Sequence, residues 1–279
     1  MYAKVETPSQ ALELAIQSVI NGGTISSPRG QSTLEIHNAT IVMEKPWLVP
    51  FEVQGRKFRD FIGAVEALQL VGQTVSSEIV TTGSKAFKRF TDGGIFHGAY
   101  GPRIYGRLEA LVNLLKSDPD SRQAVLTIFD SRQDLGAAVR DVPCTLALQF
   151  FVRDEQLCMR VNMRSNDVWL GLPYDIVQFA ALQGAVAKAL DLPMGWYSHS
   201  VGSMHLYATD HDQAEQIKAV DDGIWDYEPL WSGNSIAEIS NAARTILYQL
   251  PRQQQGPATV FETWLEAQIQ DAMYKAVAE

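Results

Sequence analysis

The stretch that decides the fold is residues 157–176, which read LCMRVNMRSNDVWLGLPYDI. Its first part, residues 157–163, is apolar and typical of a strand. The polar residues 164–167 follow, and then an apolar run in which Pro173 suits the first turn of a helix that we expect to reach about Leu190. The junction is either a solvated turn or a pocket wall. Because residues 169–173 are very apolar and an arginine and a hydroxyl precede them, a phosphate pocket is the sharper interpretation.

The segments on either side of this stretch mix strands and helices. Strand-like patterns cover residues 33–43 (one strand or two), 124–129, 145–152 and 196–207, and 145–152 pairs with 157–163 as a hairpin. Helical patterns cover residues 8–20, 58–71, 104–116 and most of the chain's end, while 83–101 reads as a long loop. Because strands and helices do not alternate strictly, the pattern predicts an α+β fold.

The composition and charge narrow the class of protein. A chain of 279 residues, 46% of them hydrophobic, suits one large domain or two small ones, and we expect a single domain over 1–279. No apolar run could span a bilayer and residues 1–10 lack a secretory pattern, so we expect a cytoplasmic protein with no membrane partner. We also expect no bound metal. The net charge of −9, without any Lys/Arg run, favours a small phosphorylated ligand over polymeric nucleic acid.

The chain has two cysteines, Cys144 and Cys158, too few for a disulfide framework. A free cysteine is usually a small buried apolar residue, and this interpretation suits Cys158 in the middle of a strand. Cys144 follows Pro143 at the start of a strand. The polar residues 164–167 leave a second interpretation open for it, a reactive thiol beside a phosphate pocket.

Four short segments carry a resemblance to a known family. They are Pro143-Cys144, Gln149-Phe150, Arg164-Ser165-Asn166-Asp167 with Gly171-Leu172-Pro173, and Gly202-Ser203-Met204-His205-Leu206-Tyr207. In order and spacing they resemble the successive signatures of the thymidylate synthase superfamily over residues 143–207. The resemblance implies a homodimeric α+β fold, with a mixed or antiparallel sheet flanked by helices and the sheets packing in the dimer. It also implies a pyrimidine nucleoside monophosphate as substrate and 5,10-methylenetetrahydrofolate as carbon donor.

The resemblance further implies a role for each site residue. For catalysis these are Cys144 as the nucleophile and Glu66 as the acid/base carboxylate that organises water, with a solvated helix glutamate as the alternative for Glu66. The nucleotide-binding residues are Arg29, Arg164 and Ser165 at the phosphate, Arg122 reaching the phosphate bound by the other subunit, His205 and Tyr207 at the sugar 3′-hydroxyl, and Asn166. The folate-side residues are Asp167 at the pterin, Gly171 and Tyr100.

The implied chemistry needs these groups. Carbon 5 of a pyrimidine is a poor nucleophile, and thiolate addition at carbon 6 makes carbon 5 enamine-like, so that it can attack the one-carbon unit. We expect nearby arginines to favour the thiolate form of Cys144. Because the proton on carbon 5 must then leave, a base or an ordered water is required.

Two positions depart from thymidylate synthase. Asp175 stands where those enzymes have an asparagine that reads uracil, and Thr145 stands where they have a histidine. A carboxylate accepts from the amino group of cytosine, whereas an asparagine amide matches the donor and acceptor of uracil. An aspartate favoured by the helix N-terminus is the structural alternative for Asp175. Gln123 stands where the family often has a second arginine, which weakens the phosphate assignment.

With these departures the chain resembles the deoxycytidylate hydroxymethylase of T-even phages. The resemblance implies that water captures the exocyclic methylene intermediate, giving a 5-hydroxymethyl nucleotide and tetrahydrofolate. We favour dCMP over CMP as substrate. The alternatives are a thymidylate synthase acting on dUMP, a non-catalytic nucleotide- or RNA-binding member, and a DNA cytosine-5 methyltransferase, for which the sequence shows neither a glycine-rich cofactor loop nor a basic face.

Overall fold

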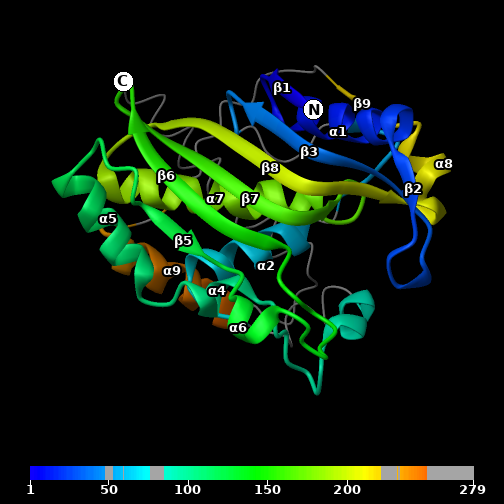
Figure 1. The fold of residues 1–279 in the computed structure, drawn as a ribbon. Helices are drawn as coiled ribbons and strands as arrows, with labels where there is room; N and C mark the ends of the chain where they lie inside the picture. The colour runs from blue at the N-terminus through cyan, green and yellow to red at the C-terminus, as the bar shows by residue number, and fades with distance from the viewer. Residues whose placement is uncertain (48–52, 59, 76–84, 221–230, 232, 250–279) are drawn as a thin grey trace.

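The computed structural model describes residues 1–47, 53–58, 60–75, 85–220, 231 and 233–249 (Figure 1). Part of the helical end that the sequence predicts, and the start of the loop expected at 83–101, lie outside these ranges. Within them, no helix has both the length and the apolar character needed to cross a membrane. The expectation of one domain over 1–279 stays a prediction.

A mixed sheet forms the front of the molecule in Figure 1. Among the described residues its strands run in the order β1-β3-β8-β7-β6-β5, with β2 paired to β3. The strands are β1 (Tyr2–Val5), β2 (Thr24–Ser26), β3 (Thr33–Met43), β5 (Val125–Thr127), β6 (Thr145–Arg153), β7 (Gln156–Asp167) and β8 (Met194–Tyr207). The pairs β1–β3 and β7–β8 are parallel and the others antiparallel. A separate two-stranded sheet joins β4 (Val53–Gln54) to β9 (Lys218–Ala219).

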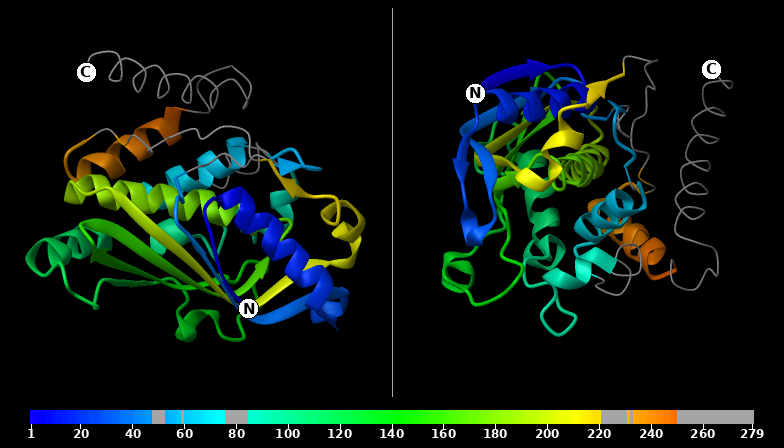
Figure 2. Two further views of the ribbon diagram at one scale, coloured as in Figure 1. Left: turned by 90° about the horizontal axis from the view of Figure 1, so that it is seen from above. Right: turned by 90° about the vertical axis from the view of Figure 1, so that its right-hand side faces the viewer.

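The helices lie mostly behind this sheet (Figure 2). They are α1 (Pro8–Gly22), α2 (Asp60–Val71), α4 (Tyr100–Arg103), α5 (Arg107–Ser117), α6 (Ser131–Asp134), α7 (Leu172–Leu190), α8 (His211–Ala214) and α9 (Ile236–Gln249), with 3-10 turns η1 (Pro28–Gly30), η2 (Lys85–Phe90) and η3 (Ala208–Asp210). The view from above in Figure 2 shows α7 along the sheet, with α2 and α9 beyond it. The predicted α+β architecture, a mixed sheet flanked by helices, is therefore confirmed.

Local sequence signals explain where the helices begin and end. Thr7 caps α1 by accepting a hydrogen bond from the backbone N–H of Gln10, whose side chain bonds back to the cap, and Pro8 takes the first helical position. Helix α7 has Pro173 in its first turn and ends where Asp191 adopts a left-handed conformation with φ of 57°.

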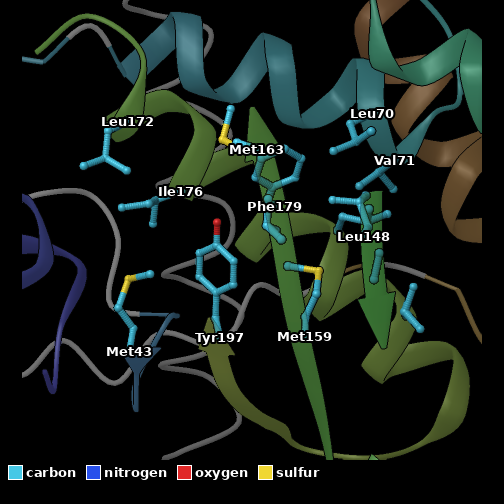
Figure 3. Close-up of a cluster of buried hydrophobic side chains, with 14 of the residues drawn as sticks. Met43, Leu70, Val71, Leu148, Met159, Met163, Leu172, Ile176, Phe179 and Tyr197 are labelled. Carbon is cyan, nitrogen blue, oxygen red and sulfur yellow. The ribbon is translucent and has the colours of Figure 1, made fainter. Parts of the chain in front are cut away.

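The hydrophobic core fills the space between the sheet and helices α2 and α7. Figure 3 shows Phe179 of α7 among Leu70 of α2, Met159 of β7 and Tyr197 of β8. Phe179 and Tyr197 are fully buried. Burial of one such side chain stabilises the fold by roughly 1.5–3 kcal/mol, so this layer anchors α7 against the sheet.

The buried face of the two central strands changes phase near the middle of the sheet. Apart from Cys158, the buried positions of β7 are odd-numbered as far as Met163, and then Asn166 is buried. In β8 the buried positions include Tyr197 and Val201, and then Met204. Neighbouring strands are irregular at the same level, since Asn38 of β3 has φ of 56° and β6 shifts register between Thr145 and Ala147. Because side chains along a strand alternate between the two faces of the sheet, a one-residue change of phase turns the previously outward positions toward the core.

Several predicted elements need correction. Residues 164–167, expected between a strand and a helix, belong to β7, because their backbone pairs with β8. The loop expected at 83–101 contains η2 and the start of α4. Strands β1 and β2 and helix α6 were not predicted. The other expected helices and strands are confirmed to within a few residues, and 33–43 is one strand.

Candidate active site

Cys144 lies immediately before β6, where its carbonyl accepts a hydrogen bond of 2.8 Å from the backbone N–H of Arg164. Burial raises the pKa of the Cys144 thiol to about 11; Arg164 and Arg29 lower it, and the charges of Asp175 and Asp141 raise it further. The arginines favour the thiolate, as expected, but desolvation outweighs their effect and the net pKa is raised. Deprotonation of this thiol requires a neighbouring base.

Arg164 braces the chain that leads into Cys144. Its Nε donates to the carbonyl of Pro143 and its Nη2 to the carbonyl of Val142, each at 2.9 Å. The side chain is exposed, so guanidinium N–H groups remain for a phosphate. Arg29, exposed in η1 with φ of 54°, lies close enough to act on the Cys144 thiol. The structure thus brings these two predicted phosphate ligands to the cysteine.

Asp175 is buried in the first turn of α7 and both of its oxygens accept hydrogen bonds. Asn166 Nδ2 donates to Oδ2 at 2.8 Å, and Gln178 Nε2 donates to Oδ1 at 2.9 Å. Burial raises the pKa of Asp175 to about 7 despite these two bonds, and the charge of Asp167 adds to the effect. The carboxyl group can therefore gain or lose a proton near neutral pH.

A buried chain of hydrogen bonds continues behind Asn166. His199 Nε2 lies 2.8 Å from Asn166 Oδ1, and the Tyr197 hydroxyl lies 2.6 Å from His199 Nδ1. Burial lowers the pKa of His199 to about 3, so the ring is neutral. Because an ionised Asp175 can only accept, Asn166 turns its amide nitrogen toward it. His199 then donates through Nε2 to Asn166, and Tyr197 donates to His199.

Gly171 makes the contact between β7 and α7 possible. A Cβ atom at this position would lie 3.1 Å from Asn166 Nδ2 and 3.4 Å from Asp175 Oδ2. The structure therefore gives Gly171 a packing role beside Asn166 and Asp175. Its predicted role toward the folate stays a prediction.

Glu66 on α2 is half-buried, so it is not the solvated helix glutamate that the sequence left open. Desolvation raises its pKa to about 8, and the charges of Asp175 and Asp141 add to this rise. Asp141 and Asp175 thus both lie near Glu66, and the three form a group of carboxyls. Two of them, Glu66 and Asp175, have pKa values near neutrality, which suits proton transfer.

The predicted sugar and pterin residues share one face of the sheet. Asp167 pairs with His205 and Ser165 with Ser203 in the β7–β8 register, and Ser165 Oγ lies 3.4 Å from His205 Nδ1. The rings of His205 and Tyr207 meet edge to face at 5.4 Å between centroids. The residues expected at the sugar and at the pterin are therefore adjacent.

Tyr100 stacks on Phe179 of the core, with ring centroids 6.0 Å apart and an interplanar angle of 8°. Burial, followed by the charges of Asp175 and Cys144, raises the pKa of the Tyr100 hydroxyl well above its ordinary value. Thr145 lies beside the same hydroxyl. The structure therefore places Tyr100 between the core and the group of carboxyls.

Arg122 is exposed just before the edge strand β5, and its carbonyl accepts a hydrogen bond of 3.0 Å from Gln149 Nε2. Gln149 lies five residues beyond Cys144 along β6, which corresponds to ~16 Å of extended chain. Arg122 is therefore remote from the cysteine of its own chain, and its contribution to a second subunit stays a prediction.

Sequence reasoning missed five residues near the site, namely Arg56, Asp141, Gln178, Tyr197 and His199. Gln178 follows Asp175 by three helical positions, a spacing that places both on one face. Asp141 precedes Cys144 by three residues, and such proximity was the available signal. Arg56 lies between the rings of Phe58 and Trp169, at 4.7 and 4.4 Å from the centroids, and bonds the Trp169 carbonyl. Nothing in the sequence indicated that contact.

Comparisons of the sequence with known proteins find a matching family profile and individual relatives. The sequence profile of the family described as thymidylate synthase matches residues 80–223, more than half of the chain. A protein named deoxyuridylate hydroxymethyltransferase from Bacillus phage SP01 is 29% identical over 222 residues, covering 73% of this chain and 58% of that protein. One of the same name from Delftia phage PhiW-14 is 31% identical over 158 residues, covering 51% and 44%. The matched stretch spans about half the length of these relatives. The resemblance read from residues 143–207 is confirmed, and the chain belongs to the thymidylate synthase family.

Proposed function

We propose that this protein transfers a one-carbon unit to carbon 5 of a pyrimidine nucleoside monophosphate and that water captures the exocyclic methylene intermediate, giving a 5-hydroxymethyl nucleotide. The observation that carries the proposal is the position of Cys144 near Asp175 and the arginines Arg164 and Arg29. Glu66 in turn lies near Asp175. The names of the two phage relatives support hydroxymethylation as the outcome.

Asp175 supports cytosine as the base, and dCMP rather than CMP remains our preferred substrate. An ionised carboxylate presents two hydrogen-bond acceptors to the base. This suits the amino group and a protonated ring nitrogen of cytosine, but it repels the carbonyl oxygen at carbon 4 of uracil. The bonds from Asn166 and Gln178 stabilise the ionised form. The second candidate is hydroxymethylation of dUMP, favoured by the names of the relatives. A protonated Asp175 offers one donor and one acceptor and could read uracil.

We assign each step of the proposed reaction to residues of this chain. The Cys144 sulfur adds to carbon 6 after its proton passes to a neighbouring carboxylate, because burial holds the pKa of the thiol high. Asp175 holds the base edge, and Arg29 and Arg164 hold the phosphate. Glu66, whose pKa is about 8, is poised to take the proton from carbon 5.

The described residues fit a folate on the side of Asp167. Asp167 Oδ1 accepts hydrogen bonds from the backbone N–H groups of Trp169 and Leu170 at 2.8 and 2.9 Å. Among the described residues Oδ2 accepts none, so it can accept from donors such as those of a pterin. Leu170 is 41% exposed, an apolar surface beside that carboxylate. Methylenetetrahydrofolate, when bound, supplies the one-carbon unit. The chain's own residues orient the acceptor carbon and move the protons.

We also propose that the protein acts as a homodimer. Arg122 is exposed and remote from Cys144 of its own chain, which fits a role at the phosphate bound by a second subunit. Exposed apolar side chains, including Val125 and Leu146, lie on the edge strand β5 and on its neighbour β6. Sedimentation and activity of mixed Cys144→Ala and Arg122→Ala subunits test this role, because such heterodimers regain one intact site only if Arg122 acts across the interface.

Product analysis tests the reaction. The protein is incubated with dCMP, CMP or dUMP together with methylenetetrahydrofolate, and the nucleotide is identified by mass spectrometry. We expect 5-hydroxymethyl-dCMP and no dihydrofolate absorbance. Dihydrofolate would indicate a thymidylate synthase reaction, and binding without any product would indicate a non-catalytic member.

The two cysteines provide a matched pair of variants. Cys144→Ala should abolish release of tritium from carbon 5, whereas Cys158→Ala, which removes a buried thiol in β7, should retain it. Unchanged release from Cys144→Ala would exclude Cys144 as the nucleophile.

A further inference from the structure

Asp141 is a carboxylate near the site to which the residue roles described so far assign no function. It lies three residues before Cys144, in the segment whose carbonyls at Val142 and Pro143 are held by Arg164. Its position along the chain is therefore tied to that of the cysteine. Its charge raises the pKa of Cys144 and of Glu66, which places it close to both.

A rigid support holds the Asp141 carboxylate in place. Its Oδ2 accepts a hydrogen bond of 2.9 Å from the backbone N–H of Gly98, where a Cβ atom would lie 2.9 Å from Oδ1. The residue before Gly98 is fixed in turn, because Arg103 donates to the His97 carbonyl at 2.9 Å and to the buried carboxylate of Asp134. Only a glycine allows this close approach.

Asp141 differs from Asp175 in that one of its carboxylate oxygens accepts no internal hydrogen bond among the described residues. Both oxygens of Asp175 already accept internal hydrogen bonds, and the proposed function assigns this group to the base edge. Among the described residues, Asp141 Oδ1 receives no hydrogen bond, while Oδ2 is anchored. Burial raises the pKa of Asp141, against the lowering effect of the Gly98 bond, so the group is a stronger base than an exposed aspartate.

We propose that Asp141 is the general base that activates the water which captures the exocyclic methylene group at carbon 5. This inference rests on the proposed function. The water oxygen bonds to the methylene carbon and its proton passes to Asp141. The electron pair of the exocyclic double bond moves into the ring and is then returned as the double bond between carbons 5 and 6 re-forms. The Cys144 sulfur leaves with the electrons of its bond to carbon 6. Glu66 remains free to serve the proton of carbon 5.

The reverse of this step can be followed without any folate. A 5-hydroxymethyl nucleotide bound at Cys144 loses hydroxide to give the exocyclic methylene, and water adds back. In water labelled with heavy oxygen, each cycle places the label in the hydroxymethyl group, which mass spectrometry of the nucleotide measures. Removing a general base should slow this exchange by about a hundredfold.

Asp141→Asn is the informative variant, because an amide oxygen can still accept from the Gly98 N–H while the group can no longer take a proton. Asp92→Asn is the matched control: Asp92 Oδ2 likewise accepts a backbone N–H, from Arg140, at 2.9 Å. We expect Asp141→Asn to exchange the label about a hundredfold more slowly than the wild type, with unchanged nucleotide binding and an unchanged unfolding midpoint. Asp92→Asn should retain the exchange rate, nucleotide binding and the unfolding midpoint.

A second measurement separates water activation from a structural role. An added small thiol can also capture the exocyclic methylene and needs no base once it is ionised. With Asp141→Asn the ratio of thioether to hydroxymethyl product should rise. Equal exchange in the wild type and in Asp141→Asn, or an unchanged product ratio, overturns the role of Asp141. Absence of exchange in the wild type with both hydroxymethyl-dCMP and hydroxymethyl-dUMP overturns the proposed function instead.

Discussion

Asn166 Nδ2 donates a hydrogen bond of 2.8 Å to Asp175 Oδ2, and this bond joins the end of β7 to the first turn of α7. The partner that the amide oxygen of Asn166 finds on its other side, His199, is neutral and buried. The carboxylate that we assign to the base edge is therefore held by a side chain whose own orientation is determined deep in the core.

The first prediction concerns the base. Asp175→Asn restores a donor and an acceptor in place of two acceptors, so the preference should move from cytosine toward uracil nucleotides by about tenfold to a hundredfold, the discrimination of one bidentate pair. The ratio of kcat/KM for dCMP and dUMP measures it. A ratio that does not move would remove the basis for assigning cytosine.

The second prediction concerns the buried chain behind Asn166. Tyr197→Phe removes the hydroxyl that donates to His199 Nδ1 and leaves that nitrogen buried without a partner, at a cost of ~1–3 kcal/mol in the free energy of unfolding. Urea denaturation measures the change. Tyr2→Phe, at a position 69% exposed, is the control and should change stability by less than about 0.5 kcal/mol. Equal effects of the two substitutions would contradict the hydrogen-bond chain.

The third prediction concerns pH. The pKa values of Asp175 and Glu66 are raised to about 7 and about 8, so ionising either group in the fold opposes folding. A raised pKa contributes stability at low pH that is lost as pH rises through the folded value. The free energy of unfolding should therefore fall between about pH 5.5 and about pH 8.5, by an amount on the order of 2–4 kcal/mol for each group.

Two variants assign this loss of stability. Asp175→Asn and Glu66→Gln should each flatten the dependence on pH, and urea denaturation at the two pH values compares their slopes with that of the wild type. A slope that is the same in all three proteins would show that neither carboxyl ionises in this range.

The fourth prediction concerns the support beneath Gly98. Burial opposes ionisation of Asp134, but hydrogen bonds from Arg103, the backbone of Asp130 and His97 outweigh it and lower its pKa to about 2. Its contribution to stability is therefore present at neutral pH and lost as pH falls through that value.

Substitution of this residue tests that contribution. Asp134→Asn would leave the Arg103 guanidinium, 10% exposed, with an unbalanced charge and should cost ~3–5 kcal/mol in urea denaturation. Asp118→Asn on the exposed end of α5 is the matched control. A cost below about 1 kcal/mol for Asp134→Asn would mean that the pair contributes little.

Much of the fold could be predicted because its longest elements carry strong periodic signals. The hairpin of β6 and β7 and the helix that starts near Pro173 follow from apolar runs and one proline. Short elements such as β1, β2 and α6 could not be predicted, because three or four residues hold little pattern and their structure depends on distant pairing partners. Residues 164–167 were misjudged for a related reason: their polarity resembles a turn, but parallel pairing with β8 keeps them extended.

The site could be predicted where a motif supplied the residues, and not where packing supplied them. The structure places Asp175 near both Cys144 and Glu66, while the roles of these residues stay predictions. The pKa of Cys144 could not be foreseen, because it depends on how far desolvation exceeds the effect of the arginines. His199 and Tyr197 read as ordinary strand residues, and their contact with Asn166 exists only through the pairing of β7 with β8 and the change of phase between them.

That change of phase restricts how this part of the chain can diversify. Deleting or inserting a single residue between Met163 and Asn166 would move the Asn166 amide to the other face of the sheet, away from Asp175. A serine or a charged side chain would then point into the hydrophobic core. Descendants of this sequence can therefore exchange side chains along β7 but cannot alter the length of the strand there. Altered base selectivity should arise by replacement at unchanged spacing, with the number of residues from Cys144 to Asp175 preserved.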